Sequence, residues 1–199
     1  TRTPRPRPEE APHRPERRSR AASPWFLFAV VFVCGADLMG LEIIGSRMLA
    51  PYFGNSIFVW GSLIGVFLAA LSLGYYLGGK LVDRRPRAGL LALLLFLAGL
   101  AVLAIPYYSS AVNGWIVLRD WDDRVGSLVA CLIYFFLPGV LMGTTSPFVI
   151  RLTASSVAQV GQTAGAVYAI STLGSLVGTF GSAFFLLSYL GAAATIKLL

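Results

Sequence analysis

Long apolar runs, separated by short clusters of charge, dominate this 199-residue chain. Five of them span residues 25–49, 57–81, 89–108, 125–150 and 163–190. As a helix, each is long enough to cross a hydrocarbon core of roughly 30 Å. Lipid admits only helices and closed barrels, because backbone polar groups must be satisfied internally, and no series of alternating apolar segments indicates a barrel. We predict an all-α, polytopic transmembrane helical bundle of about five spans.

The composition supports a membrane protein and bears on its partners. Hydrophobic residues make up 56% of the chain and charged residues 13%, which is too apolar for an ordinary soluble domain. The formal net charge of +7 comes mostly from the N-terminal segment and one loop. Neither region interleaves aromatic side chains with its arginines, as a groove that binds single-stranded nucleic acid does. We therefore expect the lipid bilayer as a partner and no nucleic acid.

The chain divides into a polar segment and an apolar domain. Residues 1–24 are rich in Pro and Arg and carry few apolar side chains. Such a segment cannot bury enough surface to offset its ordering entropy, so we predict a disordered basic cytoplasmic tail. Residues 25–199 form the predicted transmembrane helical domain. Because residues 191–199 turn apolar again, we expect that this domain is truncated at its C-terminal end.

The distribution of basic residues predicts the orientation. The loop after the second run carries four of them, Lys80, Arg84, Arg85 and Arg87. The basic tail and Arg151 lie on the same side if the runs alternate in direction, whereas the opposite side has only Arg119 and Arg124, diluted by aspartates. Cytoplasmic loops carry the excess of Lys and Arg, so the N-terminus is predicted to be cytoplasmic. Residues 113–124 would then lie outside, along the membrane surface.

Three charged residues, Asp37, Glu42 and Arg47, interrupt the first apolar run. A charge at the bilayer centre costs at least about 2.5–3.5 kcal/mol, and Asp37 lies roughly 18 Å along the helix from Trp25, near the midplane. Successive members are five residues apart and therefore differ by about 140° around the helix, so they do not share one face. Two interpretations remain: a buried polar network that fixes helix packing, or a mid-membrane ligand or proton site, with Asp37 and Glu42 suited to a cation.

Small residues at four-residue spacing mark predicted helix contacts, since they let backbones approach closely in lipid. These positions are Gly61, Gly65, Gly74 and Gly78 in the second run, Gly139 and Gly143 in the fourth, and Gly174 and Gly178 in the fifth. They could serve packing within the chain or an oligomer interface. In the fourth run, Pro138 and Pro147 are expected to kink the helix, because proline has no backbone N–H to donate.

The chemistry-bearing residue types are sparse. His13 is the only histidine, which removes a Ser-His-Asp triad and His-based zinc sites. Cys34 and Cys131 fall inside predicted helices, where two isolated thiols are small apolar core residues. We predict no catalytic residues, no metal site and no cofactor in this chain.

The segment that follows the second run resembles a known transporter loop. It reads Gly-Gly-Lys-Leu-Val-Asp-Arg-Arg-Pro-Arg from Gly78, and it looks like the Gly-x-x-x-Asp-Arg-x-x-Arg loop of major facilitator transporters. The matching residues are Gly79, Asp83, Arg84 and Arg87. The resemblance implies a loop that braces two helices at the cytoplasmic face.

Three stretches together resemble the membrane domain of bacterial fused major-facilitator/spermidine-synthase proteins. They are residues 42–56, which read Glu-x-x-x-x-Arg-x-Leu-x-Pro-x-Phe-Gly-x-Ser, residues 74–83, and residues 137–147 with 165–178. The resemblance implies a multi-pass protein of the bacterial plasma (inner) membrane. In full-length relatives it implies a cytoplasmic aminopropyltransferase-like domain after the helices. This chain has no strand–glycine loop–helix unit for such a domain, so no aminopropyl-transfer residues can be carried over.

Taken together, the sequence predicts a non-catalytic integral membrane domain of the spermidine-synthase family. We expect it to anchor or scaffold, with binding of a polyamine or another small ligand near Asp37 and Glu42 as a further role. The alternatives are half of a major-facilitator-type transporter, or an accessory subunit of a larger membrane complex. Whether the full-length protein is an enzyme is left open by this chain.

Overall fold

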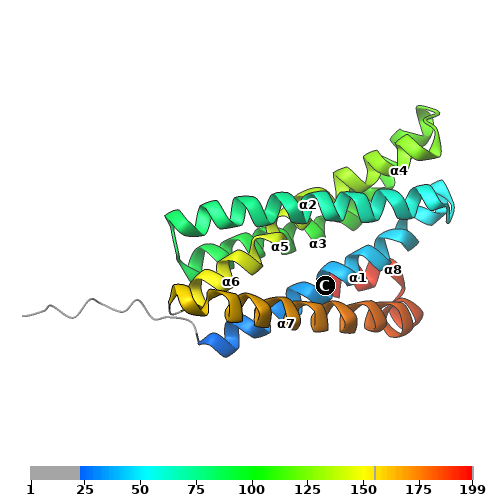
Figure 1. Cartoon of the computed structure of the whole chain (residues 1–199). Coiled ribbons are helices and arrows are strands. Elements are labelled where there is room, and N and C mark those ends of the chain that lie inside the picture. Colours follow the sequence, from blue (N-terminus) through cyan, green and yellow to red (C-terminus); the bar gives the residue numbers. More distant parts are fainter. Residues whose placement is uncertain (1–22, 155, 199) are drawn as a thin grey trace, which may run out of the picture.

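The computed structural model describes residues 23–154 and 156–198, in which every regular element is a helix (Figure 1). The elements are α1 (Pro24–Phe53), α2 (Ile57–Arg84), α3 (Ala88–Leu118), α4 (Asp123–Cys131), the π-helix η1 (Leu132–Phe136), α5 (Leu137–Gly143), α6 (Thr145–Thr153), the 3-10 turn η2 (Val157–Gln159), α7 (Val160–Phe180), the π-helix η3 (Gly181–Leu186) and α8 (Leu187–Leu198). Five helical stretches of the described chain are long and apolar enough to cross a membrane, which confirms the predicted all-α polytopic bundle. Most of the predicted disordered tail, residues 1–22, lies outside the described residues.

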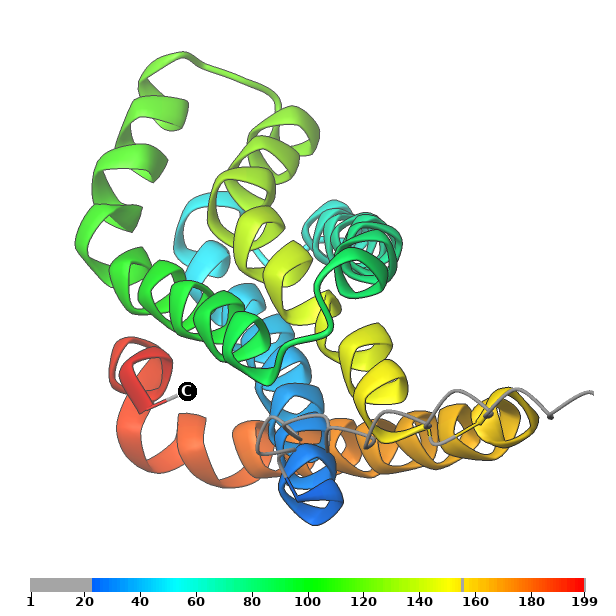
Figure 2. The ribbon, with the colours of Figure 1, turned by 90° about the vertical axis from the view of Figure 1, so that its left-hand side faces the viewer.

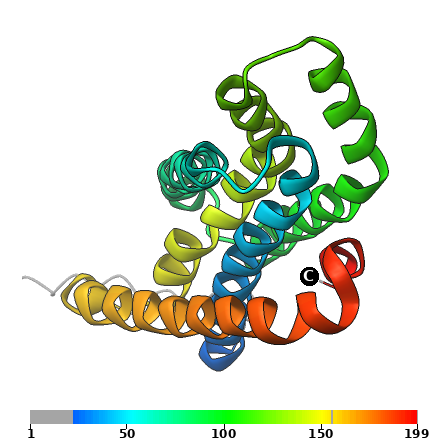
Figure 3. The same cartoon turned by 90° about the vertical axis from the view of Figure 1, so that its right-hand side faces the viewer.

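Two groups of helices meet at α1. In one group, α2 packs along α4, η1, α5 and α6, and α3 packs against α5. In the other, α7 packs against α1 over a long contact, and α8 then reaches both α1 and α3. In the two end-on views α1 crosses α7 and continues toward the helices from α2 to α6 (Figures 2 and 3). α1 contacts helices of both groups, and the contacts of α6 with α7 and of α3 with α8 join the groups as well. The charged residues of α1 are therefore placed by both groups.

The core consists of two clusters of buried apolar side chains. The larger contains Leu41, Ile44 and Phe67, with Phe135 of the fourth span stacked on Phe67 at a ring-centroid distance of 5.4 Å. The smaller lies toward the start of α1 and includes Leu27. Both clusters join α1 to helices from the α2–α6 group, so dispersion and close packing, rather than charge, hold this part of the bundle together.

The fourth span is interrupted at both predicted positions. The π-helix η1 ends immediately before α5, whose second residue is Pro138, and a further break at Thr144 precedes α6 and Pro147. Thr144 Oγ1 donates a hydrogen bond of 2.7 Å to the Leu141 carbonyl at this break. The regular α-helix is therefore interrupted near both prolines, as expected where a proline has no N–H to donate to the carbonyl one turn earlier.

At three glycines the backbones of α1 and α7 come into direct contact. A Cβ atom placed on Gly174 or Gly178 would collide with backbone atoms of α1, and one on Gly35 would collide with backbone atoms of α7. Ser175 Oγ also donates a hydrogen bond of 3.2 Å to the Gly35 carbonyl. Glycine at these positions therefore lets the two helices touch directly.

The remaining predicted packing glycines fall into two classes. Gly74, Gly78, Gly139 and Gly143 lie at close contacts between α2 and the fourth span; for example, a Cβ on Gly78 would lie 2.8 Å from Thr144 Cα. By contrast, a Cβ on Gly61 or Gly65 would meet no atom within 4 Å in the described part of the chain. These two positions take no part in helix packing there, and their role remains a prediction.

The segment predicted to lie outside begins within a helix. Residues 113–118 form the last turns of α3, and the position of residues 113–124 along the membrane surface stays a prediction. Asn113 is 1% exposed and its Oδ1 accepts a hydrogen bond of 2.7 Å from the Tyr134 hydroxyl, while Ile116 is fully buried. The connection to α4 is therefore confined to residues 119–122, where Asp120 adopts a positive φ of 51°. The buried hydrogen bond and the packing of Ile116 explain why the helix continues.

Candidate functional site

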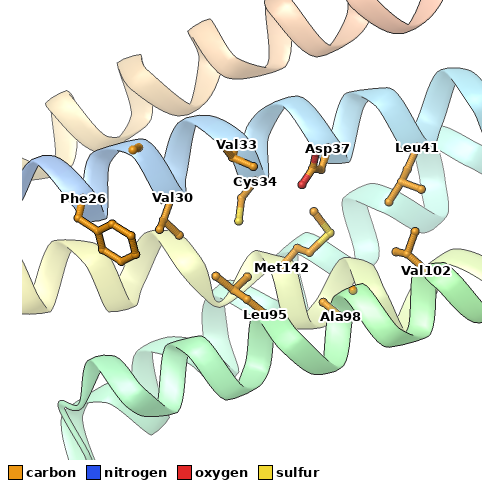
Figure 4. A pocket seen from close by; sticks show the side chains of 12 residues that line it. Phe26, Val30, Val33, Cys34, Asp37, Leu41, Leu95, Ala98, Val102 and Met142 are labelled. Carbon is orange, nitrogen blue, oxygen red and sulfur yellow. The ribbon is translucent and has the colours of Figure 1, made fainter. Parts of the chain in front are cut away.

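A cavity of about 350 Å³ opens between α1, α3 and α5 and contains Asp37 (Figure 4). We call it the Asp37 cavity. Its walls are Phe26, Ala29, Val30, Val33, Cys34, Asp37 and Leu41 from α1, Leu95, Ala98, Gly99 and Val102 from α3, and Met142 from α5. Asp37 is the only charged residue among them, so the cavity is an apolar chamber with one carboxylate.

The α1 wall follows directly from helix geometry. Phe26, Val30, Val33, Asp37 and Leu41 recur at intervals of three and four residues, which places them on one face. This face is opposite the glycine contact with α7, because Gly35 belongs to the other side of the helix. The opposite wall and the floor could not be predicted in this way, since they come from α3 and α5.

The Asp37 carboxylate is half-buried and receives no hydrogen bond or ion pair from the described residues. An ionised carboxylate surrounded by apolar walls at membrane depth is costly unless it is paired. A cation, a hydrogen-bond donor or water in the cavity would supply the missing partner. The geometry therefore points to a ligand or a polar group that enters from outside the described residues.

The structure does not bring the other two charged residues of α1 to Asp37. Glu42 is half-buried and is absent from the walls of the Asp37 cavity. Arg47 is exposed and lines a separate cavity of about 290 Å³ between α1, η3 and α8. The three side chains thus occupy different faces, as the five-residue spacing indicated, and Asp37 and Glu42 do not form a joint cation site.

A second, much smaller cavity lies behind the Asp37 cavity. Its volume is about 20 Å³, and its polar lining includes Tyr75, Thr145, Ser146 and Ser171 beside Cys34. Thr145 Oγ1 donates a hydrogen bond of 3.6 Å to Cys34 Sγ, and Cys34 lines both cavities. A polar space of this size accommodates about one water molecule. Sequence reasoning missed this cluster because its hydroxyls come from three different helices.

The role of the loop after α2 as a brace stays a prediction, and an ion pair at Asp83 involves a residue outside the motif. Asp83 Oδ1 lies 3.9 Å from Arg151 Nε, which links the end of α2 to α6. Arg84 and Arg87 are exposed and form no ion pair with the described residues, and a Cβ on Gly79 would meet no atom within 4 Å there. The Asp83–Arg151 pair is exposed and therefore contributes little stability.

The Asp37 cavity offers the geometry of a binding site. The described residues contain no group of three His, Cys, Asp or Glu side chains that could hold a metal ion. The two cysteines are buried and free. What remains is a cavity with one carboxylate, suited to a small molecule or a polar side chain.

Comparison with protein families gives a single broad result. The family model for the Major Facilitator Superfamily matches residues 1–179, which include α1 through almost all of α7. Comparisons with curated proteins and with solved structures gave no match. The match agrees with the resemblance of the Gly79–Arg87 loop and extends it to most of the chain.

Proposed function

The chain belongs to the Major Facilitator Superfamily, and from this premise we propose that it forms one bundle of a transporter-type membrane domain that binds a small cationic solute. The Asp37 cavity is the observation that carries the proposal. It provides a single carboxylate within the membrane-spanning part of α1, enclosed by apolar walls. Ligand sites of this kind are mostly apolar, with a small number of placed polar groups.

The lining of the cavity limits the charge of the solute. One carboxylate pairs one ammonium group, and every further ammonium would be buried against apolar walls without a partner, which is costly. The sulfur atoms of Cys34 and Met142 and the ring of Phe26 favour an apolar, polarisable body. A monovalent amphipathic cation therefore fits the cavity better than a polyamine with several charges.

A binding experiment tests this function. The full chain in lipid nanodiscs is titrated with tetraphenylphosphonium as a monovalent apolar cation and with spermidine as a polyamine. We expect Asp37→Asn to weaken tetraphenylphosphonium binding by about tenfold or more, the equivalent of about 1.4 kcal/mol. Glu42→Gln is the matched control, since Glu42 lies on the same helix outside the cavity, and it should leave the affinity unchanged.

Three results would count against the proposal or redirect it. Tight binding of spermidine with no binding of the monovalent cation would restore the polyamine interpretation. An equal loss of affinity in Asp37→Asn and Glu42→Gln would show that the cation responds to the negative charge of the protein in general and not to the Asp37 cavity. No binding of either compound would leave Asp37 as a partner for another helix, and the solute-binding function would be withdrawn.

A second candidate is the non-catalytic membrane domain of a spermidine-synthase-family protein, which anchors or scaffolds a cytoplasmic aminopropyltransferase-like domain or other subunits. It is supported by the resemblance of residues 42–56, 74–83, 137–147 and 165–178. Many of these residues lie where α1 ends, with Gly54 at a φ of 70°, or at the close helix contacts of Gly143 and Gly174. Affinity purification of the tagged chain from its native membrane tests this candidate, and recovery as a lone monomer would contradict it.

The cytoplasmic position of the N-terminus is also a proposal, and localisation to a bacterial inner membrane goes with it. The start of α1, the α2–α3 connection with its arginines and the end of α6 with Arg151 lie at the same end of the bundle (Figure 1). This arrangement supports the orientation predicted from positive charge. Labelling of a single cysteine introduced at Ser23 or at Asp120 with a membrane-impermeant maleimide in intact cells tests it, and labelling at Ser23 alone would reverse it.

A further inference from the structure

Arg47 offers a charged group that the proposed solute site does not use. It lies 23 residues after the first residue of α1, which is roughly 34 Å along the helix at about 1.5 Å per residue. This distance exceeds the hydrocarbon thickness of roughly 30 Å, so Arg47 lies near the membrane boundary opposite the N-terminus. Its side chain is exposed and forms no ion pair with the described residues.

Arg47 lines an open hollow at the surface of the bundle. We call this space the Arg47 cavity; it measures about 290 Å³ and is lined by Arg47, Ala183, Leu187, Ser188 and Ala192. Two features of the backbone shape it. The π-helix η3 widens the helix at residues 181–186, and Gly191, at a φ of 73°, turns the chain within α8 so that Ala192 completes the wall. The alanines contribute only methyl groups, which leaves room beside the guanidinium.

The polar groups that line the cavity are hydrogen-bond donors and therefore suit an anion. Arg47 supplies a planar fork of N–H donors, which binds phosphate oxygens in pairs, and Ser188 supplies a hydroxyl that makes no hydrogen bond to the described residues. No carboxylate lines the cavity. We propose that the Arg47 cavity binds a phosphate group, with Arg47 as the charged ligand and Ser188 as a second donor.

Two sources could supply this phosphate. The position at the membrane boundary matches the depth of phospholipid headgroups, and Leu187 with the two alanine methyls would contact the glycerol and upper acyl chain of a lipid. A soluble phosphate would use the same two donors without the apolar contacts. In both cases the phosphate accepts hydrogen bonds from a guanidinium and a hydroxyl. The site is independent of the proposed solute site, because the Arg47 cavity shares no lining residue with the Asp37 cavity.

Native mass spectrometry of the full chain in detergent tests the proposal. The protein is titrated with dimyristoyl phosphatidylglycerol, and in a parallel series inorganic phosphate is titrated and followed by phosphorus NMR line width. We expect Arg47→Gln to weaken lipid binding by about tenfold and Ser188→Ala by about threefold, since Arg47 supplies a positive charge and paired donors whereas Ser188 supplies one neutral donor. Arg47→Lys keeps the charge but loses the planar fork of donors. Its affinity for the lipid should lie between that of Arg47→Gln and that of the parent.

Arg119→Gln is the matched control. Arg119 is an exposed arginine that lies over the ring of Trp115 at 5.1 Å and does not line the cavity, so its replacement should leave lipid binding unchanged. Equal weakening by Arg119→Gln and Arg47→Gln would overturn the site, because it would indicate binding to general surface charge. Absence of both lipid and inorganic phosphate binding would overturn it as well. If Arg47→Gln does not fold, the Ser188→Ala and Arg47→Lys variants decide, and parental affinity in both would refute the proposal.

Discussion

The two faces of α1 differ in what they meet. One face touches α7 closely at three glycines, and the Ser175 hydroxyl of α7 donates a hydrogen bond to the Gly35 carbonyl of α1. The opposite face turns toward α3 across the Asp37 cavity, with α5 as its floor. The same helix therefore has one closely packed side and one accessible side.

The difference between the two faces shows how one membrane helix can pack stably and also carry a half-buried charged residue. Direct backbone contact provides dispersion energy and excludes lipid without any polar group. Asp37 could not be placed on that face, because a carboxylate needs space and a partner. We therefore expect substitutions on the two faces to have opposite consequences, with the α7 face controlling stability and the cavity face controlling binding.

The largest expected effect is on the α7 face. Gly174→Leu places a side chain against the backbone of α1, with no flexible atom that could yield, and should lower the free energy of unfolding by about 3 kcal/mol or prevent folding. Thermal unfolding in mild detergent, followed by circular dichroism, measures this. Gly165→Leu on the same helix is the control, because a Cβ there would meet no atom within 4 Å of the described chain. Similar stability of the two variants would contradict the backbone contact.

A change of opposite sign is expected at the cavity. Asp37→Leu removes a half-buried carboxylate that has no partner among the described residues and should raise the free energy of unfolding by about 1–2 kcal/mol. It should also abolish binding of the monovalent cation. Unfolding in sodium dodecyl sulfate measures the first effect. Loss of stability would instead support the interpretation of Asp37 as part of a structural polar network.

A substitution that fills the cavity and leaves its charge unchanged distinguishes the effect of cavity volume on cation binding from the effect of the carboxylate. Gly99 lines the Asp37 cavity, and a Cβ there would meet no atom within 4 Å in the described residues. Gly99→Leu should therefore change stability by less than about 1 kcal/mol, while reducing the affinity for tetraphenylphosphonium at least about tenfold. Unchanged affinity would show that the cation binds elsewhere.

The smallest expected effect on stability is again on the α7 face. Ser175→Ala removes the hydrogen bond to the Gly35 carbonyl and should cost about 0.6 kcal/mol, the average for such bonds between membrane helices. Thr172→Ala is the control, because Thr172 bonds only to the carbonyl of Tyr168 within its own helix. A cost for Ser175→Ala as large as that for Gly174→Leu would mean that the hydrogen bond, rather than backbone contact, holds α1 to α7.

Part of the candidate site follows from local sequence. The depth of Asp37 and its separation from Glu42 and Arg47 depend only on the rise and turn of one helix. The structure agrees, since the three charged groups lie on different faces. The walls supplied by Ala98, Gly99 and Met142 could not be predicted, because apolar residues of this kind look the same on every span.

The glycines show the same limit. Gly61 and Gly65 have the four-residue spacing of Gly174 and Gly178, yet only the latter pair meets another helix among the described residues. The spacing of the glycines indicates that another helix can approach closely, but it does not indicate which helix does so. The continuation of α3 through Asn113 is similar, because it depends on the Tyr134 hydroxyl of a distant helix.

The sequence by itself determined the number of spans, their helical character and the interruption of the fourth span at its prolines. These properties depend on hydrophobic length and on backbone hydrogen bonding within a segment, and lipid enforces them regardless of neighbours. Only the tertiary structure decided which face of α1 is sealed by α7 and which opens around Asp37. Contacts between helices in lipid depend on the fit of two surfaces, and a sequence records each surface separately without recording which two meet.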